Sequence, residues 1–274
     1  MKNPKISIAY ASDLHLPPTR TQRRIRALNF PPESDVIVLA GDIAVGMQAA
    51  DVAFDLAEWY PETHIVWIAG NHEFYGNSID DQIDLYRKIC THQDRIHFLE
   101  NDSVELFGIK FLGCTLWTDF SILGDSELAM EQAEQLISDF RFIRTRAGSP
   151  ISPKFVSNKF QESHRFLDEQ LAACDPQRTI VVTHFPPGMA TANPNFMVSP
   201  LTAYFNANAE FLINSYQPAL WIYGHNHFSN DLEFGRTRIV SNQLGYPSED
   251  GRIPRYDPSR LIVLDTGTDD DTKK

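Results

Sequence analysis

Residues 36–42 read VIVLAGD, a run of five apolar residues followed by a glycine and a carboxylate. A short apolar run that ends in polar residues is typical of a buried strand. The same pattern recurs at residues 6–11, 65–69, 110–115, 179–183 and 220–223. Candidate helices lie between the first runs, around residues 21–28, 48–59 and 77–90. The opening third therefore predicts strand-helix-strand repeats that build a parallel sheet.

The pattern changes further along the chain. Residues 96–99, 103–107 and 110–116 follow one another with short polar breaks, which predicts β-hairpins. Strand signals return at residues 237–241 and 260–264, which indicates a second sheet or a mixed extension of the first. We therefore expect an α/β fold, with two sheets packed as a sandwich and helices outside.

The remaining segments predict one domain over residues 1–274. Residues 118–173 form a mainly helical insertion that could cover the mouth of a site, with Phe160, Leu167 and Leu171 on one helix face and Ser157 as the N-cap. Residues 185–200 contain several prolines and predict an irregular loop. The tail after residue 265 is polar and charged, so we expect it to be frayed.

Composition narrows the class of protein. The chain has 274 residues, and 42% of them are hydrophobic, which is ordinary for a globular domain. Its formal net charge of -12 is unsuited to coating long nucleic acid. Its three cysteines, Cys90, Cys114 and Cys174, indicate buried thiols rather than a disulfide framework or a thiolate zinc site. The apolar run near the N-terminus stops at Asp13, too early for a signal peptide or a membrane span. We expect a cytoplasmic protein with no membrane partner.

Five polar clusters follow the ends of predicted strands. They are Asp13-Leu14-His15, Gly41-Asp42, Gly70-Asn71-His72-Glu73, His184, and Gly224-His225-Asn226-His227. Ligands of open parallel sheets bind beyond the carboxyl ends of the strands, so such clusters can converge on one crevice. On an extended segment, residues two apart point the same way, so Asp13 with His15 and His225 with His227 could each clasp one ion. The glycines would leave room for a metal or substrate at the rim.

Each cluster also has an ordinary structural explanation. A lone Gly-Asp is more often a turn or helix cap than a metal ligand, and a lone His184 is more often an interior histidine. The distribution of all nine histidines decides between the two explanations. His15, His72, His184, His225 and His227 occupy predicted strand ends, whereas His64, His92, His97 and His164 do not. Together the clusters predict a metal site.

With these five blocks in this order, the sequence resembles the calcineurin-like metallophosphoesterase superfamily. The superfamily's ordered signature is Asp-x-His, Gly-Asp, Gly-Asn-His-(Asp/Glu), His and Gly-His-x-His, and it spans Asp13 to His227 here. The resemblance implies a four-layer α-β-β-α sandwich of two mixed β-sheets flanked by helices. It also implies a phosphoric ester hydrolase that uses a hydroxide between two metal ions.

The resemblance assigns roles residue by residue. Asp13, His15 and His227 would hold the first metal, Asn71, His184 and His225 the second, and Asp42 would bridge the two. His72 would be the general acid, or a donor to a phosphate oxygen, with support of the metal ligands as the alternative. Glu73 and Asn226 are expected to be orienting or structural residues. Imidazole, carboxylate and amide ligands without thiolate suit two divalent or trivalent transition-metal ions, namely Mn, Fe or Zn, with Co or Ni as further candidates, rather than calcium.

The sequence differs from one subgroup of the superfamily in a way that bears on the substrate. Protein serine/threonine phosphatases of this superfamily carry Asp and Arg where this chain has Val45 and Gly46, which disfavours a phosphoprotein substrate. The chain looks more like the bacterial-type small-molecule phosphoesterases and phosphodiesterases. The expected substrate is a phosphodiester or phosphomonoester of a small molecule, with nucleotides as the first candidates. Some side chains near the rim could contact the organic group, although ordinary core or lid packing is the better explanation for any single one of them: Tyr75, Trp117, Phe120, Phe185, Asn193 and Phe196.

Three questions stay open at the level of sequence. Arg141, Arg144 and Arg146 form a basic cluster that could contact phosphate or simply face solvent. A non-catalytic metal-binding scaffold is one alternative function, against which the presence of His72 and of every metal position argues. A nuclease acting on short oligonucleotides is another, against which the acidic net charge argues.

Overall fold

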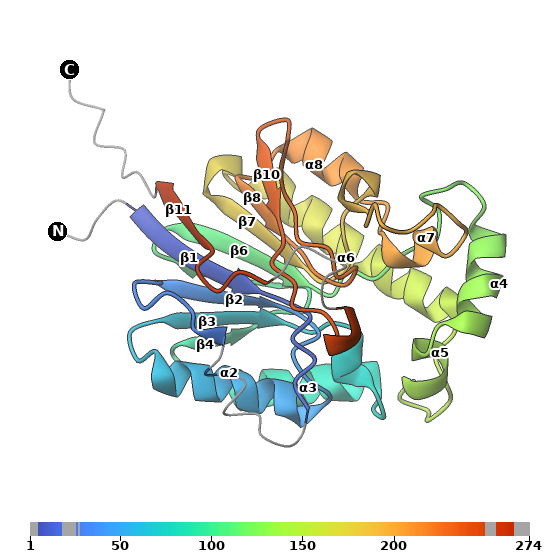
Figure 1. Cartoon of the computed structure of the whole chain (residues 1–274), viewed down its shortest axis with the longest axis horizontal. Helices are drawn as coiled ribbons and strands as arrows, with labels where there is room; N and C mark the ends of the chain where they lie inside the picture. The colour runs from blue at the N-terminus through green and yellow to red at the C-terminus, as the bar shows by residue number, and fades with distance from the viewer. Residues whose placement is uncertain (1–4, 18–25, 27, 250–255, 266–274) are drawn as a thin grey trace.

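A computed structural model describes residues 5–17, 26, 28–249 and 256–265. Two β-sheets lie face to face, and helices cover their outer faces (Figure 1). This is the α/β sandwich of two mixed sheets that we expected from the sequence. No helix in these residues has the length and apolar character needed to cross a bilayer.

The first sheet has the strand order β11-β1-β2-β3-β4. Its parallel members are β1 (Lys5–Ala11), β2 (Val36–Ala40), β3 (His64–Ile68) and β4 (Ile96–Phe98), and β11 (Leu261–Asp265) pairs antiparallel with β1. Because β1, β2 and β3 are parallel and adjacent, the residues that follow them meet at one edge of the sheet.

The second sheet has the order β5-β6-β7-β8-β10-β9. Its strands are β5 (Asp102–Leu106), β6 (Ile109–Cys114), β7 (Thr179–Thr183), β8 (Leu220–Ile222), β9 (Asp231–Phe234) and β10 (Thr237–Val240). β6, β7, β8 and β10 pair in parallel, and the two edge strands are antiparallel to their neighbours. In each sheet the central strands are parallel, so their carboxyl ends lie side by side.

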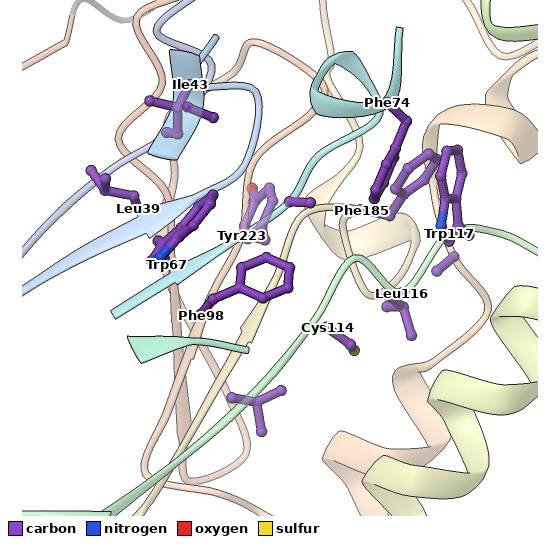
Figure 2. Close-up of a cluster of buried hydrophobic side chains, with 14 of the residues drawn as sticks. Leu39, Ile43, Trp67, Phe74, Phe98, Cys114, Leu116, Trp117, Phe185 and Tyr223 are labelled. Atoms are coloured by element: carbon purple, nitrogen blue, oxygen red, sulfur yellow. The ribbon is translucent and has the colours of Figure 1, made fainter. Parts of the chain in front are cut away.

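Both faces of the central strands are buried, which explains their continuous apolar sequences. Val36 and Val38 belong to the core between the sheets, with Ile180 and Val182 of the second sheet. The alternate residues of β2, Ile37 and Leu39, belong to the cluster beneath the helices. In Figure 2, Leu39 lies beside Trp67, with Phe98 next to them.

The helices complete the layers. α2 (Met47–Trp59) and α3 (Ile79–Cys90) pack on the first sheet, whereas α6 (Pro153–Ala173) packs on the second, with α8 (Glu210–Tyr216) against α6. The short helices α4 (Ser126–Leu136), α5 (Asp139–Phe142) and α7 (Thr202–Phe205) gather at one end of the molecule (Figure 1). The 3-10 turns are η1 (His72–Phe74), η2 (Pro176–Arg178), η3 (Met189–Thr191) and η4 (Pro247–Glu249).

Two expectations from the sequence were wrong. Residues 96–98 are β4, which pairs in parallel with β3, so of the three expected hairpin segments only the last two, β5 and β6, pair as a hairpin. The chain changes sheets before Asp102. Ser157 is a buried residue inside α6, and the N-cap is Ser152, whose hydroxyl accepts a hydrogen bond from Phe155 N. Pro153 begins the helix because the first helical position needs no donor.

Two further expectations fall outside the described residues. They are the helix expected around residues 21–28, apart from residues 26 and 28, and the tail after residue 265. Residues 118–173 are mainly helical, as we expected: they contain α4, α5 and α6, and irregular chain at residues 143–152 joins α5 to α6. Residues 185–200 are irregular apart from η3, as their prolines indicate.

Candidate metal centre

The five polar clusters of the sequence meet at the carboxyl ends of the central strands. Three groups of side chains bring their potential ligand atoms within 4.8 Å of one another. These groups are Asp13 with His15 and His227, His15 with Asp42 and His72, and Asp42 with His184 and His225. Residues from both sheets therefore build one centre, and Asp42 belongs to two of its groups.

Asp42 lies among several histidines. Its Oδ1 is 3.4 Å from His184 Nε2, and its Oδ2 is 3.8 Å from His72 Nε2 and 3.9 Å from His15 Nε2. The side chain is 3% exposed, so its charge acts on these rings with little screening by water. A carboxylate with one oxygen toward each half of a cluster has the geometry of a bridging ligand.

Asn71 completes the half of the centre around His184. Its Oδ1 is 3.1 Å from His184 Nε2, while its Nδ2 donates to Asp139 Oδ1 over 3.1 Å. The amide nitrogen is thereby turned away from the cluster and the oxygen toward it. That orientation is the one a metal-ligating asparagine needs, because only the oxygen carries a lone pair for the ion.

The backbone at the strand ends is unusual. Asp13, His15, Asp42, His225 and His227 all have positive φ angles, between 42° and 75°. We expected Asp13 with His15, and His225 with His227, to share a face because each segment would be extended. Left-handed turns bring Asp13 and His15 together instead, and they place His225 and His227 in different groups of potential ligands. Such conformations cost free energy and persist where the surrounding structure enforces them, as it does at ligand sites.

Glycines leave room for the cluster. A Cβ atom on Gly70 would lie 2.7 Å from His184 Nε2 and 2.6 Å from Asp42 N. One on Gly224 would lie 2.7 Å from Asp13 Oδ2, and one on Gly41 would lie 2.5 Å from His184 Nδ1. These three positions match the glycines that the sequence places beside the polar clusters.

Burial and charge set the protonation of the histidines. Burial lowers the pKa of His15 to about 4, and burial together with His184 holds the pKa of His225 well below its ordinary range. Burial also opposes the charged form of His184, but the Asp42 carboxylate raises its pKa to about 9. His15 and His225 are therefore neutral at pH 7, and each has one ring nitrogen that carries a lone pair.

The residues fit bound cations. His225 Nε2 is buried and has no hydrogen-bond partner within the described chain, which is costly for an imidazole unless a ligand completes it. Neutral imidazoles, carboxylates and an amide oxygen are together a donor set for transition metals. The centre can thus hold metal ions, while the role of each residue as a ligand stays a prediction.

Other buried groups hold the centre in place. Glu73 accepts hydrogen bonds from the backbone amides of Asp42, Ile43 and Gly70 and so ties the ends of β2 and β3 together. Asn226 donates to Thr191 O and accepts from Gln243 Nε2. Both residues thus hold neighbouring segments of the chain in place, and their effect on the metal ligands stays a prediction.

Four neighbours of the centre, Asp139, Tyr204, Tyr246 and Glu249, were missed by sequence reasoning. Asp139 accepts hydrogen bonds from Asn71, Tyr75 and Tyr204, and Glu249 Oε2 accepts from His227 Nδ1 at 2.6 Å. Tyr246 stacks on His15 at 4.2 Å between ring centroids, with its hydroxyl 3.1 Å from His72 Nε2. These residues come from short helices and loops without a periodic pattern, and no sequence signal pointed to them.

A cavity of about 570 Å³ opens from the centre. Of the six candidate contacts for an organic group, Tyr75, Asn193 and Phe196 line it. Trp117, Phe120 and Phe185 do not, because they are at most 1% exposed and pack in the core. In Figure 2, Trp117 and Phe185 lie side by side next to Phe74, so they cannot stack on a substrate.

The arginine cluster lies elsewhere. Arg146 forms ion pairs with Asp81 and Asp84 of α3, at a second cavity of about 350 Å³. Arg144 is joined by backbone bridges to Ser78 and Pro150, and Arg141 is exposed. None of the three lines the cavity at the metal centre, so a solvent-facing role fits them better than phosphate binding.

Comparison with known proteins identifies the family. The sequence model of the calcineurin-like phosphoesterases matches residues 6–229, most of the chain. The chain belongs to the calcineurin-like phosphoesterase family. This family membership supports phosphoester hydrolysis, and it implies divalent metal ions at a centre of this composition.

One relative by sequence and two solved structures are similar to this chain over nearly its whole length. An uncharacterized protein, L509, of Acanthamoeba polyphaga mimivirus is 27% identical over 93% of this chain and 98% of its own length. The crystal structure of phosphopantetheinyl hydrolase (PptH) from Mycobacterium tuberculosis has a TM-score of 0.74 at 17% identity and covers 95% of this chain and 97% of that one. TT1561 of Thermus thermophilus has a TM-score of 0.50 at 13% identity, covering 96% and 99%. At these identities the two structures show the fold alone.

Proposed function

We propose that this chain is a dinuclear metal-dependent hydrolase of small-molecule phosphate esters. The observation that carries the proposal is the position of Asp42, shared between two groups of potential ligands, one with His15 and one with His184 and His225. Asp13, His15 and His227 would hold one ion and Asn71, His184 and His225 the other. Mn, Fe or Zn suits this donor set best.

Bound metal ions would neutralise the phosphate oxygens and make a water nucleophilic near neutral pH. The chain's own residues supply the remaining steps. His72 Nε2 is 3.8 Å from Asp42 Oδ2, and its side chain is 20% exposed, so it can reach a phosphate ester in the cavity. A proton donated from His72 to the leaving oxygen would complete the cleavage.

His72 is held by two aromatic rings. Tyr75 stacks on it at 4.3 Å between ring centroids, and the Tyr246 hydroxyl is 3.1 Å from Nε2. The stacking restricts the ring plane, and the contact with Tyr246, which also lines the cavity, restricts the position of Nε2. This arrangement supports a direct role of His72 in the reaction over a purely supporting one.

The test is hydrolysis of bis-p-nitrophenyl phosphate and p-nitrophenyl phosphate by protein reloaded with manganese after chelation. Asp42→Asn should lose bound metal and activity together. His72→Ala should keep its metal and lose about 10²- to 10⁴-fold in kcat. His92→Ala, at an exposed histidine outside the site, is the matched control and should behave as wild type. Full activity and metal content in Asp42→Asn would refute the bridging role.

The two alternative functions make different predictions. A scaffold would bind metal but leave every phosphoester intact, and a nuclease would cut short DNA. The described lining of the cavity has no lysine or arginine, which counts against a nucleic-acid backbone. The name of the Mycobacterium tuberculosis structure makes a phosphopantetheinyl ester a substrate to include beside nucleotides.

A further inference from the structure

The cavity beside the metal centre has two chemically different parts. At its inner end it is lined by Asp42, Asn71, His72, His225 and His227. From there it extends between the α4–α5 junction and residues 192–206. A phosphate held at the inner end would therefore direct the rest of its molecule along this outer part, which we call the arm groove.

The arm groove has an apolar wall that faces solvent. Phe196, Met197 and Val198 are 71%, 92% and 66% exposed, and Leu136, which lines the same cavity, is 60% exposed. Leu201 and Phe205 extend the same surface. Single exposed apolar residues are common on proteins, but a contiguous group beside a polar centre marks a binding surface.

The arm groove itself has no charged side chain. Among the described lining residues of the cavity, the charged side chains other than histidine are Asp42, Asp139 and Glu249, which contact His184, Asn71 and His227 at the metal centre, whereas residues 136–138 and 192–206 are uncharged. A second phosphate or a carboxylate on the ligand would thus find no lysine or arginine in this lining, so it would lose water of hydration without gaining an ion pair. Favourable electrostatic contacts for an anionic group are therefore confined to the metal centre and its histidines.

We propose that the arm groove selects phosphate esters whose organic arm is uncharged and largely apolar, and that it discriminates against arms with a second anionic group. This inference rests on the proposed function, because it places the phosphate at the metal centre. The size of the cavity, about 570 Å³, is within the range of sites for small organic ligands.

Binding measured without turnover provides the test. Isothermal titration of manganese-loaded protein would compare methyl-, butyl- and octylphosphonate with 8-phosphonooctanoate, which matches the octyl compound in length but ends in a carboxylate. Each buried methylene should tighten binding about two- to fourfold until the groove is filled. The terminal carboxylate should abolish most of that gain.

Paired variants locate the effect. Phe196→Lys should reduce the preference for octyl- over methylphosphonate at least about fivefold and improve binding of 8-phosphonooctanoate, by removing apolar wall and adding a cation. Phe211→Lys, at a similarly exposed phenylalanine on α8 outside the groove, should leave all affinities unchanged. Both sites are open to solvent, so folding should tolerate the lysines.

The possible outcomes distinguish a failure of this inference from a failure of the proposed function. Equal affinity for methyl- and octylphosphonate, with bis-p-nitrophenyl phosphate still hydrolysed, would overturn the groove assignment alone. Equal binding of octylphosphonate and 8-phosphonooctanoate would overturn the charge discrimination. If no phosphonate binds and no ester is cleaved, both the assignment of the phosphate site and the assignment of the groove are refuted.

Discussion

Single residues determine whether the metal centre can form. Gly70 lies between Asp42 and His184, and its φ angle is not in the left-handed region, so alanine there adds a clash without adding backbone strain. The nearest atoms are those of the cluster and its backbone, which have little freedom to move because they are buried. A single methyl group at this position should therefore act on the site directly.

Gly70→Ala should lose metal and phosphoesterase activity while remaining folded. The reason is steric, since the new Cβ would lie 2.7 Å from His184 Nε2. Metal content and hydrolysis of bis-p-nitrophenyl phosphate would be measured beside Gly148→Ala, which strains the backbone at a φ of 87° but whose Cβ meets nothing within 4 Å, so it should retain both metal and activity. Normal metal content in Gly70→Ala would mean that the cluster is looser than its geometry indicates.

Asp139 acts on the centre through Asn71. Because its Oδ1 accepts from Asn71 Nδ2 and Tyr75 OH, Asp139→Asn should let the Asn71 amide turn and weaken one of the two metal positions about 10- to 100-fold. Metal titration followed by elemental analysis would show one ion lost at low free metal. Ser138→Ala removes only a neighbouring hydroxyl that contacts Tyr75, and should retain both ions. Two ions held equally well in both variants would contradict this role.

At the scale of elements, the segment before β11 completes the site. Residues 244–249 bring Tyr246 onto His15 and Glu249 onto His227, and Glu249 Oε2 also accepts from Tyr246 N at 2.8 Å. The Leu244 and Gly245 amides donate to Ser12 O and Asp13 O, which anchors the segment at the end of β1. One short stretch thus orients candidate ligands that follow strands of both sheets.

Glu249→Ala should weaken the metal position of Asp13, His15 and His227, because His227 loses the acceptor that fixes its ring. We expect about a tenfold or larger loss in affinity for one ion, with Glu249→Gln intermediate since its amide oxygen can still accept. Competition with a chromogenic chelator would measure it. The exposed neighbour Ser248→Ala is the control, and equal affinity in all three variants would show that His227 needs no such support.

The elements show where sequence reasoning succeeds and where it fails. The strands and the polar clusters that follow them in the sequence were predictable, because an apolar run followed by glycine and polar residues is a local pattern. The pairing of residues 96–98 with β3 was not, since a short strand has the same pattern in a hairpin and at a parallel edge. Asp139 and Glu249 act through contacts with residues distant in sequence, which no local pattern encodes.

At the scale of the whole molecule, the centre joins the two sheets. Asp13, His15, Asp42, Asn71 and His72 follow strands of the first sheet, whereas His184, His225 and His227 follow strands of the second. His15 Nε2 and His227 Nε2 are 3.0 Å apart across this junction. Ions bound there would connect the two halves of the sandwich and stabilise the folded state over the unfolded one.

Removal of metal should therefore lower the melting temperature. At a free metal concentration of about 100 Kd, binding adds about 2.7 kcal/mol to the free energy of unfolding, which corresponds to roughly 5–10 °C in Tm. Differential scanning calorimetry with chelator, and after manganese is restored, would measure the difference. In Asp42→Asn this difference in Tm should be much smaller. An unchanged Tm in the wild type would indicate that the ions are held too weakly to affect folding.

The division of the centre between the two sheets also bears on biosynthesis. A growing polypeptide emerges from the ribosome with Asp13, His15 and Asp42 first, long before His225 and His227. Early in translation the available carboxylates and imidazoles form only half of a coordination shell, which would bind ions weakly and with little selectivity. Tight capture must then wait until the second sheet has been synthesised and has closed over the first, so metal loading would be among the last steps of maturation.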